Sequence, residues 1–261
     1  MSKYKAIVFD LDGTLAESKT KVPIEVANAL DRLMCNYHVA VISGGRWEQF
    51  ELQLLPYLTM APHCLPTCGT TYYRYKYDTG WTQIYNLVLP REERAKIRKT
   101  INEVVKESGL DLPQPFGQRI EDRQTQITFS ALGQEAPVHL KKKWDPDKEK
   151  RKGLVAELKA RLPEYEVRYG GTTSVDVTRK GIDKSHGIRQ LMNFLDLQTE
   201  DILFIGDALQ PGGNDYAVKT MGIDCIEVDG PKQTLREIEK ILSSRNDRCK
   251  GGSLRANLGS F

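Results

Sequence analysis

Short apolar runs alternate with helical patterns near both ends of the chain, and this alternation limits the possible folds more than any other feature. The runs are KAIVFD (5–10), YHVAVIS (37–43) and DILFIGD (201–207). Such short, almost continuously apolar runs are typical of strands buried on both faces, and intervening helices connect them in parallel. The sequence therefore predicts an α/β fold, a doubly wound parallel sheet built from residues 1–82 and 182–247.

The segment 22–36 illustrates the helical pattern. Its apolar residues recur at three- and four-residue spacings and so share one helical face: Val26, Ala29, Leu30, Leu33 and Met34. Pro23 stands where a first helical turn tolerates proline. We expect further helices at 46–58, 214–221 and 233–244.

Residues 83–181 follow a different pattern. Long charged helices are predicted at 91–108 and 145–162, and alternating strands at 126–132, 165–169 and 172–178. Helices packed on one face of an antiparallel sheet explain this mixture, so we predict an inserted α+β domain. The expected hinges are TGWTQ (79–83) and RKGID (179–183). The tail, residues 248–261, lacks periodicity and is rich in glycine, serine and basic residues, which predicts disorder.

Composition adds weaker constraints. The 261 residues carry a net charge of +3 with both signs interspersed, which says little about an anionic partner. No apolar run approaches about 18 residues and the amino terminus has no signal pattern, so we expect a cytoplasmic protein without a membrane partner. The five cysteines lack paired short spacings, and we expect free thiols.

The strongest local motif is FDLDGTL (9–15), which directly follows an apolar run. Asp10 stands at the carboxyl end of its strand, where open α/β sheets place ligands. Asp12 follows two residues later, and Gly13 turns the chain. One carboxylate can attack a phosphorus atom while the other exchanges a proton with the ester oxygen. An aspartate-rich turn is common, however, so other segments must support this interpretation.

Three further segments supply that support. HVAVISGG ends at Ser43, and the backbone amides of Gly44 and its neighbour can approach an anion. Lys184 begins a helical pattern where the insert ends. Asp207 ends a third apolar run and Asp215 follows a Gly-Gly-Asn turn, which together make an oxygen-only site for a hard cation. A phosphoryl group needs such an assembly of nucleophile, metal and donors.

The four ordered motifs FDLDGT, VISGG, GIDKSHG and GDALQPGGND resemble those of the haloacid dehalogenase superfamily. The resemblance implies that Asp10 is phosphorylated and that Asp12 is the general acid and base. It also implies that Mg²⁺ is held by Asp10, the backbone carbonyl of Asp12 and Asp207, with support from Asp215. Ser43 and Lys184 would then hold the phosphoryl group.

The insert is similar to a type IIB cap domain. The GGND turn and the strand TTSVDVT most resemble eukaryotic-type phosphomannomutases and sucrose- or mannosyl-phosphate phosphatases. Alternation places Ser174, Asp176 and Thr178 on one face of that strand, opposite Val175 and Val177. The resemblance implies that Ser174 and Asp176 contact a sugar.

The resemblance departs where the mutases hold a distal phosphate with arginines. Arg123 is kept, but Gln134 and Lys19 each stand where an arginine is expected. A lysine retains the charge without the bidentate fork. We therefore favour a phosphatase acting on a sugar phosphate, with a phosphomannomutase-type mutase as the alternative. A compensating cation remains open: Arg119, Arg123, Lys141, Lys142, Lys143 or Arg168.

Two other classes fit less well. A phospho-receiver domain also accepts phosphate on a strand-end aspartate, but this chain is about twice the size that one doubly wound domain needs. A nucleic-acid-binding protein is suggested by KKKW (141–144), which we interpret as a solvated helix or loop. The expected partner is therefore a small phosphorylated metabolite and not nucleic acid, and the sequence leaves the oligomeric state open.

Overall fold

The computed structural model describes residues 3–244, which divide into two compact units. The first unit contains the chain up to Asn86 and from Asp183 onward, and the second contains Leu87–Ile182. The chain thus passes between the units after residues 86 and 182, where the sequence suggested 82 and 181. The predicted disordered tail, 248–261, lies outside the described residues.

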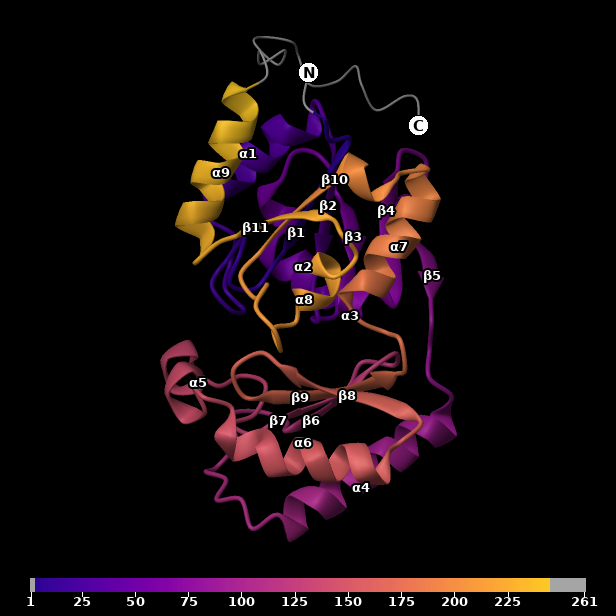
Figure 1. Cartoon of the computed structure of the whole chain (residues 1–261), viewed down its shortest axis with the longest axis vertical. Helices are drawn as coiled ribbons and strands as arrows, with labels where there is room; N and C mark the ends of the chain where they lie inside the picture. The colour runs from indigo at the N-terminus through magenta and orange to yellow at the C-terminus, as the bar shows by residue number, and fades with distance from the viewer. Residues whose placement is uncertain (1–2, 245–261) are drawn as a thin grey trace. The chain divides into compact units, whose positions relative to one another are not determined.

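The first unit is built on a seven-stranded sheet with the order β11-β10-β1-β2-β3-β4-β5 (Figure 1). Five strands pair in parallel, β1 (Ala6–Asp10), β2 (His38–Ile42), β3 (His63–Leu65), β10 (Ile202–Gly206) and β11 (Asp224–Glu227). Their carboxyl ends meet at one edge, because Asp10 pairs with Ile42 and Phe9 with Ile205. The predicted doubly wound parallel sheet is confirmed.

Helices cover both faces of this sheet. Ile7 and Phe9 of β1 belong to one core cluster and Ala6 and Val8 to the other, as expected for a strand buried on both sides. The first cluster lies under α1 (Ile24–Met34), α2 (Trp47–Gln53), η1 (Leu55–Tyr57) and α9 (Pro231–Ser243). The second lies under α7 (Lys184–Leu195) and α8 (Tyr216–Lys219), and η2 (Thr199–Asp201) precedes β10. Pro23 is the residue just before α1 rather than part of its first turn.

The hinge expected at residues 79–83 is wrong. This segment contains the end of a turn and the first residues of β5 (Gly80–Asn86). β5 pairs with β4 (Thr71–Lys76) in a hairpin that adds two antiparallel strands to the sheet. The hairpin is fixed by aromatic packing, since Trp47 stacks on Tyr73 with ring centroids 4.0 Å apart and also contacts Trp81. Aromatic contacts between distant segments therefore make this region part of the first unit.

The second unit is a four-stranded antiparallel sheet with helices on one face (Figure 1). Its strand order is β6 (Ile120–Asp122), β7 (Ile127–Ser130), β9 (Ser174–Arg179) and β8 (Tyr165–Gly170). The helices α4 (Arg91–Glu107) and α6 (Glu149–Arg161) bury their apolar residues against this sheet, and α5 (Val138–Trp144) follows β7. This arrangement is the predicted α+β packing.

No helix within residues 3–244 is long and apolar enough to cross a membrane. Cys64, Cys68 and Cys225 are free thiols, as expected.

A fully buried ion pair organises the second unit. The Arg151 guanidinium donates to Asp145 Oδ2 at 2.6 Å, and both side chains are 0% exposed. It also donates to three backbone carbonyls around the β8–β9 connection, those of Gly170, Gly171 and Ser174. The arginine thereby links α6 to the β8–β9 connection.

We predict that Asp145→Ala lowers the free energy of unfolding by about 3 to 5 kcal/mol, because the Arg151 charge stays buried without its partner. Glu149→Ala is the matched control, since it breaks the solvent-exposed contact with Lys152 and should cost about 0.5 kcal/mol or less. Urea denaturation followed by circular dichroism measures both values. A cost below 1 kcal/mol for Asp145→Ala would contradict the prediction.

Candidate active site

A buried lysine joins two aspartates at the carboxyl edge of the first sheet. The Lys184 ammonium contacts Asp10 Oδ1 and donates to Asp215 Oδ1 at 2.5 Å. All three side chains are at most 3% exposed. Asp10 is the last residue of β1, Lys184 is the first of α7 and Asp215 directly precedes α8. Three segments that the sequence singled out therefore meet in one ion-pair network.

Burial and charge set the protonation of this network. Burial acts to lower the pKa of Lys184, but Asp10 and Asp215 outweigh it and raise that pKa above its ordinary value. Burial raises the pKa of Asp10 well above its ordinary range, an effect that Lys184 opposes. The negative charges of Asp215 and Asp207 raise it further. The carboxylates thus carry more negative charge than one ammonium can balance.

This excess charge fits a divalent cation. Asp10, Asp207 and Asp215 each offer one carboxylate oxygen, and these oxygens lie within 4.8 Å of one another. Asp10 Oδ2 is buried and has no hydrogen-bond partner among the residues that the structure describes. Burial, with a contribution from Asp215, also raises the pKa of Asp207 to about 6. A hard cation bound by oxygen ligands would relieve this crowding, and the donor set suits Mg²⁺.

Two glycines make room for these carboxylates. Gly13 has φ +93°, and a Cβ there would lie 2.3 Å from Asp207 Oδ2. A Cβ on Gly206 would lie 2.5 Å from Asp215 Oδ2. Glycine at these two positions therefore lets the carboxylates of Asp207 and Asp215 approach the backbone closely, and at Gly13 it also allows the chain to turn.

Asp12 is held differently from Asp10. Its Oδ1 accepts from the backbone N–H of Lys19 at 2.6 Å, and its Oδ2 accepts from Gln49 Nε2 at 2.5 Å. Lys19 adopts φ +58°, a conformation that a residue with a side chain rarely takes. The Lys19 backbone therefore contacts Asp12 directly. The sequence analysis had considered only the Lys19 side chain, as a replacement for an arginine.

Ser43 follows β2 and is buried beside the end of β1. Its hydroxyl accepts from the Gly45 N–H at 3.0 Å, which shapes the Ser43-Gly44-Gly45 turn. The short segment α3 (Pro66–Gly69) supports this turn, because the N–H of Thr67 donates to Gly45 O and that of Cys68 to Ser43 O, both at 2.8 Å.

The α3 segment itself is strained. Thr67 and Cys68 have φ values of +48° and +57°, and both lie in the left-handed region. Non-glycine residues reach this region at a cost of about 1 to 3 kcal/mol each and persist there when the surroundings impose it. Gly69 packs against Gly187 of α7, where a Cβ would lie 2.2 Å from the Gly187 Cα. The segment therefore connects the Ser43 turn with the helix that carries Lys184.

The other predicted substrate residues belong to the second unit. Ser174 and Asp176 lie on the polar face of β9, opposite the buried Val175 and Val177. Asp176 Oδ1 accepts from Thr128 Oγ1 at 2.7 Å. Burial raises the pKa of Asp176, and the charge of Arg123 opposes that rise. Arg123 is ion-paired with Glu121 at 2.7 Å.

Lys141 was wrongly interpreted as part of a solvated basic run. It lies in α5 with only 6% exposure, and its ammonium donates to the backbone oxygen of Gln134 at 3.1 Å. A cation therefore lies beside the position where the sequence lacks an expected arginine. Its neighbours Lys142 and Lys143 are exposed, so only one lysine of the run is turned inward.

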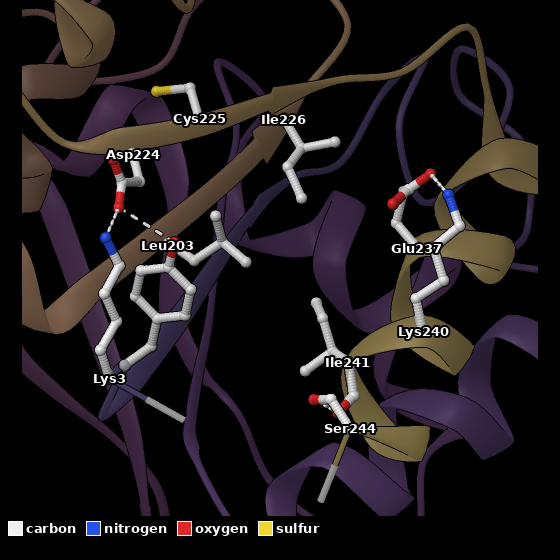
Figure 2. A pocket seen from close by; sticks show the side chains of 10 residues that line it. Lys3, Leu203, Asp224, Cys225, Ile226, Glu237, Lys240, Ile241 and Ser244 are labelled. Atoms are coloured by element: carbon white, nitrogen blue, oxygen red, sulfur yellow. Dashed lines mark hydrogen bonds and ion pairs between the residues drawn. The ribbon is translucent and has the colours of Figure 1, made fainter. Parts of the chain in front are cut away.

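A shallow depression on the first unit lies away from these residues. It lies at the amino ends of β10 and β11 and along α9, lined by Leu203, Asp224 and Ile241 among others (Figure 2). Its charged groups neutralise one another, because Lys3 pairs with Asp224 and Glu237 with Lys240. It brings together none of the residues that the motifs single out.

The parallel sheet with carboxylates and a lysine at its carboxyl edge defines the class. Among solved structures, a haloacid dehalogenase-like hydrolase from Bacteroides thetaiotaomicron is 17% identical with a TM-score of 0.62, over 91% of this chain and 99% of that chain. A truncated Plasmodium falciparum IMP-nucleotidase is 15% identical with a TM-score of 0.69, over 93% and 71%. The fold is that of the haloacid dehalogenase superfamily.

The sequence comparisons narrow this class. The model of the eukaryotic phosphomannomutase family matches residues 26–244, and the chain therefore belongs to that family. It is 25% identical over 243 residues to a phosphomannomutase of Encephalitozoon cuniculi, covering 90% of this chain and 92% of the relative. It is 27% identical over 247 residues to that of Saccharomyces cerevisiae, covering 91% and 94%.

We predict that Lys184→Met destabilises the protein at neutral pH by about 3 kcal/mol or more, because Asp10 and Asp215 stay buried without their cation. Lys219→Met is the control, since that side chain is exposed at the end of α8. Urea denaturation in excess chelator measures both variants, so that a bound metal cannot replace the ammonium. Equal midpoints for the two variants would contradict the prediction.

Proposed function

We propose that this chain is a phosphosugar mutase of the phosphomannomutase type, which moves a phosphoryl group between two hydroxyls of a hexose phosphate. The observation that carries the proposal is the family match across residues 26–244. The relatives above are named phosphomannomutases. This support favours the mutase alternative over the phosphatase that the missing arginines suggested.

Asp10 is the proposed nucleophile. A carboxylate oxygen of Asp10 attacks phosphorus, the bond from phosphorus to the sugar oxygen breaks, and an aspartyl phosphate forms. The aspartyl phosphate then passes its phosphoryl group to the free hydroxyl of a hexose monophosphate, which regenerates the carboxylate and yields a hexose bisphosphate. Asp10 takes the other phosphoryl group once the bisphosphate has turned over, and the isomeric monophosphate leaves. Asp10 Oδ2 is suited to these steps, since it is buried and carries no hydrogen bond to any described residue.

Asp12 is the proposed general acid and base. It protonates the departing sugar oxygen in the first step and takes the proton of the incoming hydroxyl in the second, so protons balance over the cycle. Lys184 stays protonated and offsets negative charge at Asp10. Ser43 and Gly44 are proposed to hold the phosphoryl oxygens.

Asp10, Asp207, Asp215 and the Asp12 backbone carbonyl are proposed to hold Mg²⁺. Such an ion, when bound, offsets the negative charge that gathers on the phosphoryl oxygens. The raised pKa of Asp10 and that of Asp207, about 6, support this assignment, because burial and the neighbouring carboxylates raise both pKa values despite the positive charge of Lys184.

A mutase also needs a binding site for the phosphate that is not being transferred. Within the second unit, the polar face of β9 carries Ser174 and Asp176, which we propose to contact the sugar. Lys141 supplies a cation beside Gln134, and Arg123 supplies another near Asp176. These two cations support the proposal, because a phosphate bound at this face would meet charged donors despite the glutamine at position 134.

The decisive experiment follows the two reactions in one sample. Phosphorus NMR of mannose 1-phosphate with Mg²⁺ and a catalytic amount of hexose bisphosphate should show accumulation of mannose 6-phosphate with little inorganic phosphate. Excess chelator should stop the reaction. Release of inorganic phosphate as the main product would reject the mutase and restore the phosphatase interpretation.

A pair of variants tests the proposed cation. Lys141→Met should shift the products toward inorganic phosphate by about tenfold or more, since a charge-assisted contact to phosphate contributes about 1.5 to 3 kcal/mol. Lys142→Met is the control, because Lys142 is exposed in the same helix. An unchanged product ratio in Lys141→Met would exclude Lys141 from phosphate binding.

We predict that Asp10→Asn abolishes phosphoryl transfer and leaves the fold intact, since the amide keeps the shape of the side chain but cannot form an acyl phosphate. The measurement is the transfer of radioactive phosphate from a labelled hexose bisphosphate to the protein. Wild-type protein should retain acid-stable label and Asp10→Asn should retain none. Persistent label in the variant would place the phosphorylated residue elsewhere.

A further inference from the structure

Gln49 lies on the first turn of α2 and reaches back to the FDLDGTL turn. Its side-chain nitrogen donates to Asp12 Oδ2 at 2.5 Å and to Gln53 Oε1 at 3.0 Å. The three residues thus form a chain of hydrogen bonds that links α2 to the proposed acid and base. No sequence motif pointed to Gln49.

The hydrogen bonds fix how the Gln49 amide is turned. An amide nitrogen has two protons, and here one goes to Asp12 and the other to Gln53. Turning the amide over would put its oxygen against the Asp12 carboxylate and against Gln53 Oε1, and both contacts would be repulsive. Gln53 is itself held in place, because it is 6% exposed and its backbone oxygen accepts from the Val22 N–H at 2.8 Å.

The backbone next to Ser43 leaves space for this amide. A Cβ on Gly45 would lie 1.7 Å from Gln49 Oε1, so any other residue at Gly45 would displace the Gln49 side chain. Gly45 also donates its N–H to the Ser43 hydroxyl. The turn that we propose to hold a phosphoryl group is therefore in direct contact with the residue that holds Asp12.

We propose that Gln49 is a positioning residue for Asp12. The backbone N–H of Lys19 holds one carboxylate oxygen and Gln49 holds the other, so that the carboxylate plane is set from two sides. Without Gln49, Asp12 keeps one hydrogen bond and can rotate about it. The proposal rests on the role of Asp12 in phosphoryl transfer and holds whether the acceptor is a sugar or water.

The chemical consequence differs between substrates. A sugar oxygen is a poor leaving group and needs the proton of a well-placed acid, whereas p-nitrophenolate leaves with little help. Misplacing Asp12 should therefore slow phosphorylation of Asp10 by a sugar phosphate much more than by p-nitrophenyl phosphate. A residue that only supported the fold would slow both reactions alike.

The test is a double-mutant cycle with single-turnover kinetics. Gln49→Leu should lower the rate of phosphorylation by mannose 1-phosphate about 10- to 100-fold with little change in KM, the range expected for one hydrogen bond to a charged group. The p-nitrophenolate burst should fall less than about threefold. In an Asp12→Ala background, Gln49→Leu should cost less than about threefold with the sugar phosphate, because the group that it positions is gone.

Matched variants keep the outcomes separate. Glu51→Leu, at an exposed position of the same helix, should behave as wild type. Gln49→Glu, which has the same shape but repels Asp12, should be at least as slow as Gln49→Leu and serves if the leucine variant does not fold. Full rates in both Gln49 variants, equal losses on both substrates, or additive losses with Asp12→Ala would each overturn the proposal.

If Asp12→Ala itself kept the wild-type rate, the proposed acid-base chemistry would be wrong, and the positioning role would fall with it. If mannose 1-phosphate yielded only inorganic phosphate, the mutase assignment would fail. The cycle would still report on Gln49 in that case, because it measures only the step that phosphorylates Asp10.

Discussion

The contact of Lys184 with Asp10 and Asp215 is the interaction on which the rest of the site depends. It joins the end of β1, the start of α7 and the residue before α8, which are far apart in the sequence. Burying three charged groups is costly unless each has a partner. The arrangement is therefore stable only when the sheet, the helix start and the acidic turn are all in place, so that the candidate active site and the fold of the first unit are specified together.

The two aspartates of the FDLDGTL motif have different surroundings, and this difference fits their proposed roles. Asp10 is buried and held by charge, with one oxygen left without a hydrogen bond to any described residue. Asp12 is held by two neutral N–H groups, one from the Lys19 backbone and one from Gln49. A nucleophile needs an available lone pair near a cation. An acid and base must instead keep a fixed position while it gains and loses a proton, which neutral donors allow without fixing its charge.

Three of the site residues that the sequence predicted lie at strand ends. Asp10, Ser43 and Asp207 each follow a continuous apolar run, and parallel strands bring such ends to one edge. Gln49 gave no signal, because its role depends on space left by Gly45 and on contact with a residue 37 positions away. The β4–β5 hairpin was missed since its tyrosines alternate with basic residues and its stability comes from Trp47 on a distant helix. A local sequence pattern cannot predict contacts between residues that are far apart in the chain.

The position of Lys141 shows why aligned residue types alone are a weak guide to the proposed reaction. The absence of an arginine from one position suggested weak binding of phosphate. Electrostatic attraction depends, however, on the distance between the charges and not on where the cation lies in the sequence. In the structure the α5 helix turns Lys141 inward, and its ammonium donates to the backbone at Gln134. A buried ammonium is less screened than an exposed one and so interacts more strongly with an anion. Where the family has an arginine, this chain thus has Gln134 together with Lys141 from α5. A count of arginines alone therefore underestimates the positive charge near this position.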